Sequence, residues 1–243
     1  MVESSTWCDT HAMAEPRAIV AVLAGGRGER LGGNKAMALL GGRPLIEHPL
    51  EAARGAGLEA IVVAKRSTPL PQLPERVHHE PESPRHPLCG VIAALELAAE
   101  RSPAPAVLLL ACDMPLLTSP LLDWLAGLDG VAMAEVDGRP QPLLTRCSSE
   151  QLPVLRAALD EQRPLRDAMA ALAPRIVDER ELSRFGDPER LCFNINSPKD
   201  LQVAQTWLDD ELATLAAQQR NIQAQIDRFS AGERIDREQL YDR

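Results

Sequence analysis

The sequence is poor in aromatic residues and in long apolar segments. Aromatic residues make up 3% of the 243 residues, with a single tyrosine. Because single-stranded nucleic acids stack on aromatic side chains, this scarcity argues against a nucleic-acid partner. No apolar run approaches the roughly 20 residues of a membrane-spanning helix, and residues 1–16 lack the apolar core of a secretory signal. We therefore expect no membrane partner and a flexible N-terminal extension at residues 1–16.

Positive charge and paired cysteines are scarce as well. The 26 lysines and arginines are outnumbered by 35 aspartates and glutamates, which gives a net charge of −9. This balance disfavours general binding to nucleic acids or anionic membranes, although a local basic loop can still hold a nucleotide. The five cysteines are scattered and form no C-x-x-C pair. Because neither a zinc site nor a disulfide framework is indicated, we expect a cytoplasmic protein.

Apolar strand-like segments alternate with helical segments along the sequence. We expect strands near 18–23, 59–64, 106–111, 131–136, 142–146 and 191–195. We expect helices near 47–56, 89–100, 119–127, 149–161, 165–172 and 199–229. The alternation predicts an α/β fold with a mostly parallel sheet and helices on both faces. The proline-rich residues 67–87 predict a semi-rigid connection that could frame a pocket.

The C-terminal segment carries a heptad pattern. Apolar side chains recur at spacings of four and three, with one polar interruption, at Leu208, Leu212, Leu215, Gln219, Ile222, Ile226 and Phe229. Such a seam predicts either a helix packed against its own domain or a helix paired with a second copy in a homodimer. We accordingly divide the chain into an extension at 1–16, a domain at 17–205 and a C-terminal helical extension at 206–243.

A glycine-rich loop follows the first buried strand and is the most informative segment. Glycines let backbone N–H groups wrap around an anion, and Arg27, Arg30 and Lys35 add positive charge. The ligand that suits such a loop is a polyphosphate. The loop differs from a P-loop because no serine or threonine follows Lys35. It also differs from the G-x-G-x-x-G dinucleotide fingerprint, because Leu31 stands at the third glycine.

This loop resembles the signature loop of the MobA-like nucleotidyltransferases, L-A-G-G-x-x-x-R-[LM]-G-x-x-K. Further segments resemble the motifs of that family in the same order, namely G-G-R-P-L at 41–45, R-H-P-L-C-G-V at 85–91, C-D-M-P at 112–115 and N-I-N-S-P-K-D at 194–200. Within the family, the sequence is most similar to the molybdenum cofactor guanylyltransferases. The resemblance implies a Rossmann-like three-layer α/β/α sandwich. It also implies Mg²⁺-dependent transfer of GMP from GTP to the phosphate of molybdopterin, with release of pyrophosphate.

The resemblance also implies roles for individual residues. The expected nucleotide-binding residues are Leu23, Ala24, Gly25, Gly26, Arg27, Gly28, Lys35, Glu80, Pro87, Leu88, Gly90 and Asp113. Arg30 and Lys35 would neutralise phosphate charge and, with Asp113, form the catalytic set. A carboxylate at the end of a buried strand needs a charged partner, which a Mg²⁺–triphosphate complex supplies. Asp113 would hold this metal, with Asn196 as a second ligand.

The acceptor side is expected to involve Asn194, Asn196 and Arg139. If residues 191–195 form a strand, the two asparagines point to the same face. The acceptor of this predicted reaction is a phosphorylated small molecule, so the two partners are a nucleoside triphosphate and that molecule. His48 is either a ligand or a residue of the helix that begins beside it.

Two residues depart from the family pattern and leave alternatives open. Asn34 stands where many relatives carry aspartate, and Ala64 stands where some carry asparagine. Lys65 and Arg66 follow Ala64 and could replace its polar contact. Cytidylyl relatives usually have the sequence L-A-A-G in the first loop, whereas this chain has Gly25 at the second alanine. Because glycine lacks the methyl group, it leaves more space for a purine base and favours a guanine nucleotide. The alternatives are a related transferase that uses CTP or another phosphorylated acceptor, and a non-catalytic nucleotide-binding regulatory protein.

Overall fold

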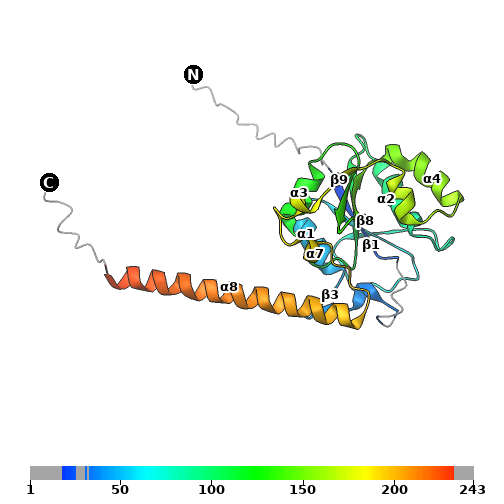
Figure 1. Ribbon diagram of the computed structural model, residues 1–243. Coiled ribbons are helices and arrows are strands. Elements are labelled where there is room, and N and C mark those ends of the chain that lie inside the picture. Colours follow the sequence, from blue (N-terminus) through cyan, green and yellow to red (C-terminus); the bar gives the residue numbers. More distant parts are fainter. Residues whose placement is uncertain (1–17, 26–30, 32, 233–243) are drawn as a thin grey trace, which may run out of the picture. The chain divides into compact units, whose positions relative to one another are not determined.

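The computed structural model describes residues 18–25, 31 and 33–232 (Figure 1). These residues form two compact units that divide between Asn196 and Ser197. The expected extension at residues 1–16 lies outside the described residues, and the predicted domain boundaries stay a prediction.

A mostly parallel sheet forms the centre of the first unit. Its seven strands have the order β5-β4-β1-β6-β8-β7-β9. The bounds are β1 (Ala18–Leu23), β4 (Ala60–Ala64), β5 (Arg76–His79), β6 (Ala106–Ala111), β7 (Ala132–Val136), β8 (Arg139–Cys147) and β9 (Arg175–Val177). Only β8 runs antiparallel to its neighbours β6 and β7, whereas β1, β4, β5 and β6 are parallel to one another. The predicted α/β class with a mostly parallel sheet is confirmed.

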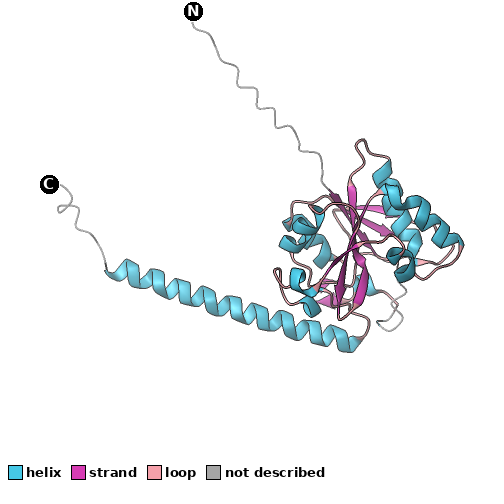
Figure 2. Cartoon of the chain, turned by 45° about the horizontal axis from the view of Figure 1, so that its top comes forward, coloured by secondary structure: helices cyan, strands magenta, loops and turns pink. Residues whose placement is uncertain are grey.

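Helices cover both faces of this sheet, which makes three layers (Figures 1 and 2). The helices of one face are α1 (Glu47–Gly55), α3 (Ser119–Ala126), α6 (Glu179–Leu182) and α7 (Pro188–Leu191). Those of the other face are α2 (Pro87–Ala99), α4 (Leu152–Asp160) and α5 (Leu165–Ala170). Strands covered on both faces are apolar without alternation, and every residue of β1 and β6 is buried.

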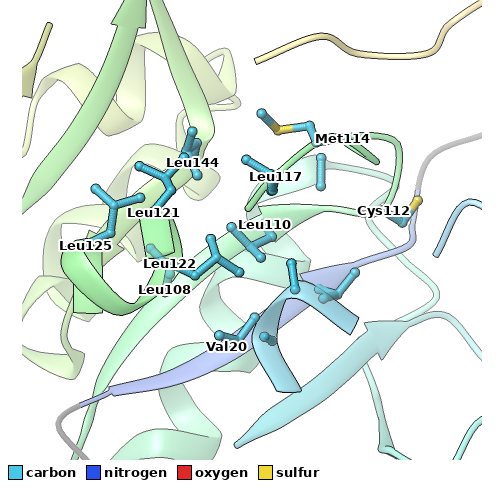
Figure 3. Close-up of a cluster of buried hydrophobic side chains, with 14 of the residues drawn as sticks. Val20, Leu108, Leu110, Cys112, Met114, Leu117, Leu121, Leu122, Leu125 and Leu144 are labelled. Carbon is cyan, nitrogen blue, oxygen red and sulfur yellow. The ribbon is translucent and has the colours of Figure 1, made fainter. Parts of the chain in front are cut away.

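Leucines of α3 close the core on one face (Figure 3). Leu121, Leu122 and Leu125 lie one helical turn or less apart, so they share the side of α3 that faces Leu108 and Leu110 of β6. All five side chains are completely buried. This packing fixes the carboxyl end of β6, and with it the loop that carries Asp113.

The predicted strand at 191–195 is wrong. Residues up to Leu191 belong to α7, because the side chain of Asp187 caps the helix by accepting from the N–H of Glu189 at 3.0 Å, and Pro188 occupies its first turn. Residues 193–196 then form an irregular segment. Asn194 and Asn196 therefore do not alternate along a strand.

Several short elements were not predicted. The proline-rich segment 67–87 contains β5, an edge strand that fits between Pro74 and Pro81. Edge strands tolerate neighbouring prolines because one side of the strand makes no ladder hydrogen bonds. The short strands β2 (Leu39–Leu40) and β3 (Arg43–Pro44) pair as a small separate ladder, and β9, α6 and α7 were also missed. A 3-10 helix, η3 (Ser149–Gln151), precedes α4.

The second unit is dominated by one helix, α8 (Pro198–Gly232), of 35 residues. Ser197 begins it, since its Oγ accepts a hydrogen bond from the N–H of Asp200 at 3.2 Å. Within the described residues, no helix combines the length and apolarity needed to cross a membrane. Four apolar members of the heptad seam are more than half exposed, namely Leu212, Leu215, Ile222 and Ile226. The side chain of Phe229 lies outside the described residues.

Candidate active site

Four neighbouring parallel strands end at one edge of the sheet, and each is followed by chemically distinctive residues. Leu23 ends β1, Lys65 follows β4, Glu80 follows β5, and Asp113 lies two residues beyond β6. The chain leaves β1 toward β4 and β5 on one side and returns to β6 on the other. Ligands of open α/β sheets bind at such a switch point, beyond the carboxyl ends of the strands.

A cavity of about 550 Å³ opens at this edge, within the range of small-molecule sites. Its lining includes six of the predicted nucleotide-binding residues: Leu23, Ala24, Gly25, Glu80, Pro87 and Gly90. The sequence-based site did not include several other lining residues, namely Asn34, Lys65, Ser67, Thr68, Arg85 and His86. Lys65, Ser67 and Thr68 follow the end of β4, Arg85 and His86 precede α2, and Asn34 precedes Lys35 of the predicted loop. These positions are the signal that could have identified them.

The Glu80 carboxylate lies between two glycines. A Cβ atom at Gly25 would overlap Glu80 Oε1, and one at Gly90 would come within 3.3 Å of Oε2. The backbone N–H of Glu80 donates to the carbonyl of Ala64 at 3.0 Å, which continues the β4–β5 pairing by one residue. The space beside Gly25, expected to accommodate a purine, is instead filled by this carboxylate.

Lys65 is the cation that faces this carboxylate. Lys65 Nζ lies 3.5 Å from Glu80 Oε1, and the two side chains are 10% and 5% exposed. The same ammonium donates to the carbonyl of Pro81. Burial raises the pKa of Glu80, and Lys65 opposes that rise. A buried carboxylate and a buried ammonium therefore compensate each other in the cavity wall.

A second polar cluster joins residues from three distant parts of the chain. Lys35 lies in the 3-10 helix η2 (Lys35–Met37), and its Nζ donates to Asp113 Oδ2 at 2.6 Å and to Asn196 Oδ1 at 2.5 Å. The backbone N–H of Ile195 donates to the carbonyl of Asp113 at 3.0 Å, which holds the irregular segment beside the β6 loop. Asn34 and Ala36, on either side of Lys35, line the cavity, so the cluster adjoins it.

The oxygens of this cluster fit a magnesium ion. Mg²⁺ is usually held by one or two carboxylates together with substrate phosphates and water. Asp113 Oδ2 and Asn196 Oδ1 already converge on one cation, the Lys35 ammonium. In the part of the chain that the structure describes, no three His, Cys, Asp or Glu side chains gather as a fuller metal site. Asp113 and Asn196 are thus the donor pair that could hold this ion.

Three other predicted site residues do not line the cavity. Leu88 is completely buried in α2, and its backbone N–H donates to Nδ1 of His86 at 3.2 Å. Asn194 donates its amide to the carbonyl of Cys192 at 3.1 Å. Arg139 is exposed at the start of β8 and does not line the cavity.

Four predicted loop residues are not among the described residues, and the structure decides between the two roles expected for His48. The predicted loop residues Gly26, Arg27, Gly28 and Arg30 lie outside the described residues. His48 is buried in α1, and its Nε2 donates to the carbonyl of Leu40 at 3.2 Å. Burial and the nearby Arg43 lower the pKa of His48, so it serves as a neutral helix residue that fastens the β2–β3 ladder.

Comparison with known proteins places these features in a family. The model of the MobA-like NTP transferase domain matches residues 20–176. A molybdenum cofactor guanylyltransferase of Pseudomonas putida is 33% identical over 190 residues, which cover 73% of this chain and 97% of that protein. A molybdenum cofactor guanylyltransferase of Cereibacter sphaeroides is 34% identical over 201 residues, with 77% and 95% coverage.

Solved structures agree on the fold. The crystal structure of molybdopterin-guanine dinucleotide biosynthesis protein A from Archaeoglobus fulgidus superimposes with a TM-score of 0.64 at 24% identity, over 79% of this chain and 98% of that one. The Rossmann-like three-layer fold implied by the sequence motifs is therefore confirmed. The matched family residues, the relatives and the strand-end site agree, and the chain belongs to the MobA-like NTP transferase family and is a nucleotidyltransferase.

Proposed function

We propose that this nucleotidyltransferase transfers GMP from GTP to the phosphate of molybdopterin, with Mg²⁺ bound and pyrophosphate released. The transfer chemistry is inferred from one observation: the Lys35 ammonium donates hydrogen bonds to Asp113 and Asn196 beside the cavity. The relatives named molybdenum cofactor guanylyltransferase support the choice of donor and acceptor.

Glu80 supports guanine as the base. An ionised carboxylate has two oxygens and accepts hydrogen bonds only. Guanine presents two adjacent donors, N1–H and its 2-amino group, which match such a pair of oxygens. Adenine and cytosine have no equivalent pair of donors on that edge. Glu80, in the lining of the cavity with both oxygens beside glycines, would therefore bind guanine preferentially.

The other end of the cavity would hold the triphosphate. The backbone N–H groups that follow Ala24, beginning at Gly25, would bind phosphate oxygens, with the predicted Gly26, Arg27, Gly28 and Arg30 continuing the loop. The N–H of Ala24 itself donates to the carbonyl of Val63 at 2.9 Å, so it takes no part in these contacts. A Mg²⁺ ion held by Asp113 and Asn196 would neutralise phosphate charge and polarise the phosphoryl oxygens when bound. Lys35, whose ammonium lies beside the same two oxygens, would neutralise charge that develops at the α-phosphate.

The acceptor needs no dedicated base, because a phosphate monoester is already ionised at neutral pH. Asn196, Asn194 and Arg139 are the proposed acceptor-binding residues. Catalysis would thus consist of positioning the acceptor phosphate in line with the leaving pyrophosphate and of stabilising the added charge.

The C-terminal helix supports a homodimer. The apolar side chains of its heptad seam that are more than half exposed suit burial in a two-stranded coiled coil. Gln219 falls at a core position of this seam and, in a parallel pair, would meet its own copy. A polar residue at a single core position sets the register of the paired helices.

Nucleotide titration tests the proposed function. Calorimetry with GTP, CTP and ATP, each with Mg²⁺, should give clear binding of GTP, weaker binding of the other two, and loss of tight GTP binding in Asp113→Ala. Lys199→Met, a change on the exposed first turn of α8, serves as the control. A preference for CTP would contradict guanylyl transfer, and binding of none of the three would contradict nucleotidyl transfer itself.

A further inference from the structure

Lys65 is a buried lysine in the wall of the cavity, and the proposed transfer chemistry gives it no task. It follows β4 directly and is 9% exposed as a residue. Lysines are almost never buried this deeply unless they are paired. Its partners are the carbonyl of Pro81 and Glu80 Oε1, the latter at 3.5 Å.

The charges around Glu80 explain why this pairing matters. Burial favours the neutral acid, and Glu82 from the same loop repels the ionised form. Lys65 is the ammonium that opposes both effects. Arg85 and His86 line the same cavity, and the neighbours of the carboxylate on the β1 loop and on α2 are glycines, which bring no charge.

The attachment of Lys65 to Pro81 fixes the position of the ammonium. A lysine has three N–H donors on a flexible stem and can otherwise follow any nearby anion. Here one donor goes to the backbone next to Glu80, so the ammonium stays beside Oε1 while the carboxylate remains within the cavity lining.

We propose that Lys65 is a positioning residue that keeps the Glu80 carboxylate ionised and in place, so that the cavity selects a base carrying both N1–H and a 2-amino group. This proposal rests on the proposed use of GTP. Lys65 acts through Glu80 and does not itself need to touch the base. Selection of guanine thereby depends on a residue outside the phosphate loop, directly after Ala64, where this chain departs from the family pattern.

A comparison of GTP with inosine triphosphate isolates this role, because the two nucleotides differ only by the 2-amino group. A hydrogen bond to a charged group contributes roughly 1.5–3 kcal/mol, so we expect the unmodified protein to bind GTP about tenfold or more tightly than inosine triphosphate. Direct contact between Lys65 and the base would instead involve the 6-oxo group, which both nucleotides carry.

The experiment measures both dissociation constants by calorimetry, with Mg²⁺, from acidic to mildly alkaline pH. In Lys65→Met we expect the preference for GTP to vanish at neutral pH and to return as the pH rises, because Glu80 then ionises without its partner. In Glu80→Gln the preference should be lost at every pH. Lys199→Met, which removes the same charge from an exposed site, should behave as the unmodified protein.

Each outcome has one meaning. An unchanged preference for GTP over inosine triphosphate in Lys65→Met at every pH would overturn the proposal and leave guanylyl transfer standing. If Lys65→Met weakens the binding of GTP and of inosine triphosphate equally at every pH, the proposal is also overturned. That result indicates direct contact between Lys65 and the base. Failure of the unmodified protein to bind GTP would overturn this proposal together with the proposed function. If Lys65→Met does not fold, carbon NMR of Glu80 in the unmodified protein decides, since a carboxyl that stays protonated at neutral pH contradicts the proposal.

Discussion

Substitution of Gly25 by alanine tests whether Glu80 occupies the nucleotide site. The new methyl group would overlap Glu80 Oε1, and the carboxylate cannot retreat freely because it is buried and paired with Lys65. Overpacking of this kind costs about 1–3 kcal/mol. Displacement of the carboxylate from the base would remove a charged hydrogen bond of roughly 1.5–3 kcal/mol. GTP affinity should therefore fall about ten- to hundredfold.

Calorimetric GTP binding and thermal unfolding measure the two parts of this loss. Gly90→Ala is the graded control, because its methyl group would come only within 3.3 Å of Glu80 Oε2. In a Glu80→Ala background, Gly25→Ala should cost little further stability, since the atom that it overlaps is gone. An equal stability cost in both backgrounds, or unchanged GTP affinity in Gly25→Ala, would refute the proposed arrangement.

Three further predictions follow from the same geometry. Lys35→Ala should lower kcat well over tenfold, because a charge in a dry site contributes several kcal/mol to transition-state stabilisation; an unchanged rate in steady-state assays would remove Lys35 from the reaction. His48, whose pKa is lowered from 6.5 by burial, stays neutral in the folded protein while the unfolded chain gains a proton. Stability should therefore fall as the pH drops below about 6.5, and His48→Gln should flatten this slope in urea titrations at several pH values; an identical slope would contradict the assignment. The double substitution Leu215→Asp and Ile222→Asp, at exposed positions of α8, should convert the expected dimer to a monomer while GTP binding persists. Light scattering measures the mass, and the same mass for the variant and the unmodified protein would exclude the α8 pairing.

The core strands could be predicted because continuous apolar runs in the sequence indicate strands that are buried on both faces. β1 and β6 are continuous apolar runs, as strands covered on both faces must be. β5 carries exposed and half-exposed residues and follows several prolines, so no alternation or apolar run marked it. The prediction of a strand at 191–195 was wrong because Asp187 and Pro188 begin the helix α7 just before it. This helix has a single turn, which is too short to show a helical pattern of apolar residues.

The candidate site was predictable where a motif carried it and unpredictable where strand register decided it. The order of the family motifs predicted that Lys35, Asp113 and Asn196 belong to one phosphate and metal site, although the first and the last are 161 positions apart in the sequence. The approach of Lys65 to Glu80 depends on the pairing of β4 with β5, in which Ala64 lies opposite His79, so the residues that follow are neighbours. A register between a predicted and an unpredicted strand cannot be obtained from the sequence.

A label-transfer assay tests whether the cluster of Lys35, Asp113 and Asn196 carries out guanylyl transfer. GTP labelled at its α-phosphate is incubated with Mg²⁺, molybdopterin and either the unmodified protein or Asp113→Asn, which preserves shape and removes the charge. We expect labelled molybdopterin and free pyrophosphate with the unmodified protein, and neither with a folded Asp113→Asn variant. Equal label transfer by both proteins would contradict the role of Asp113, and GTP binding without label transfer by the unmodified protein would contradict the proposed reaction.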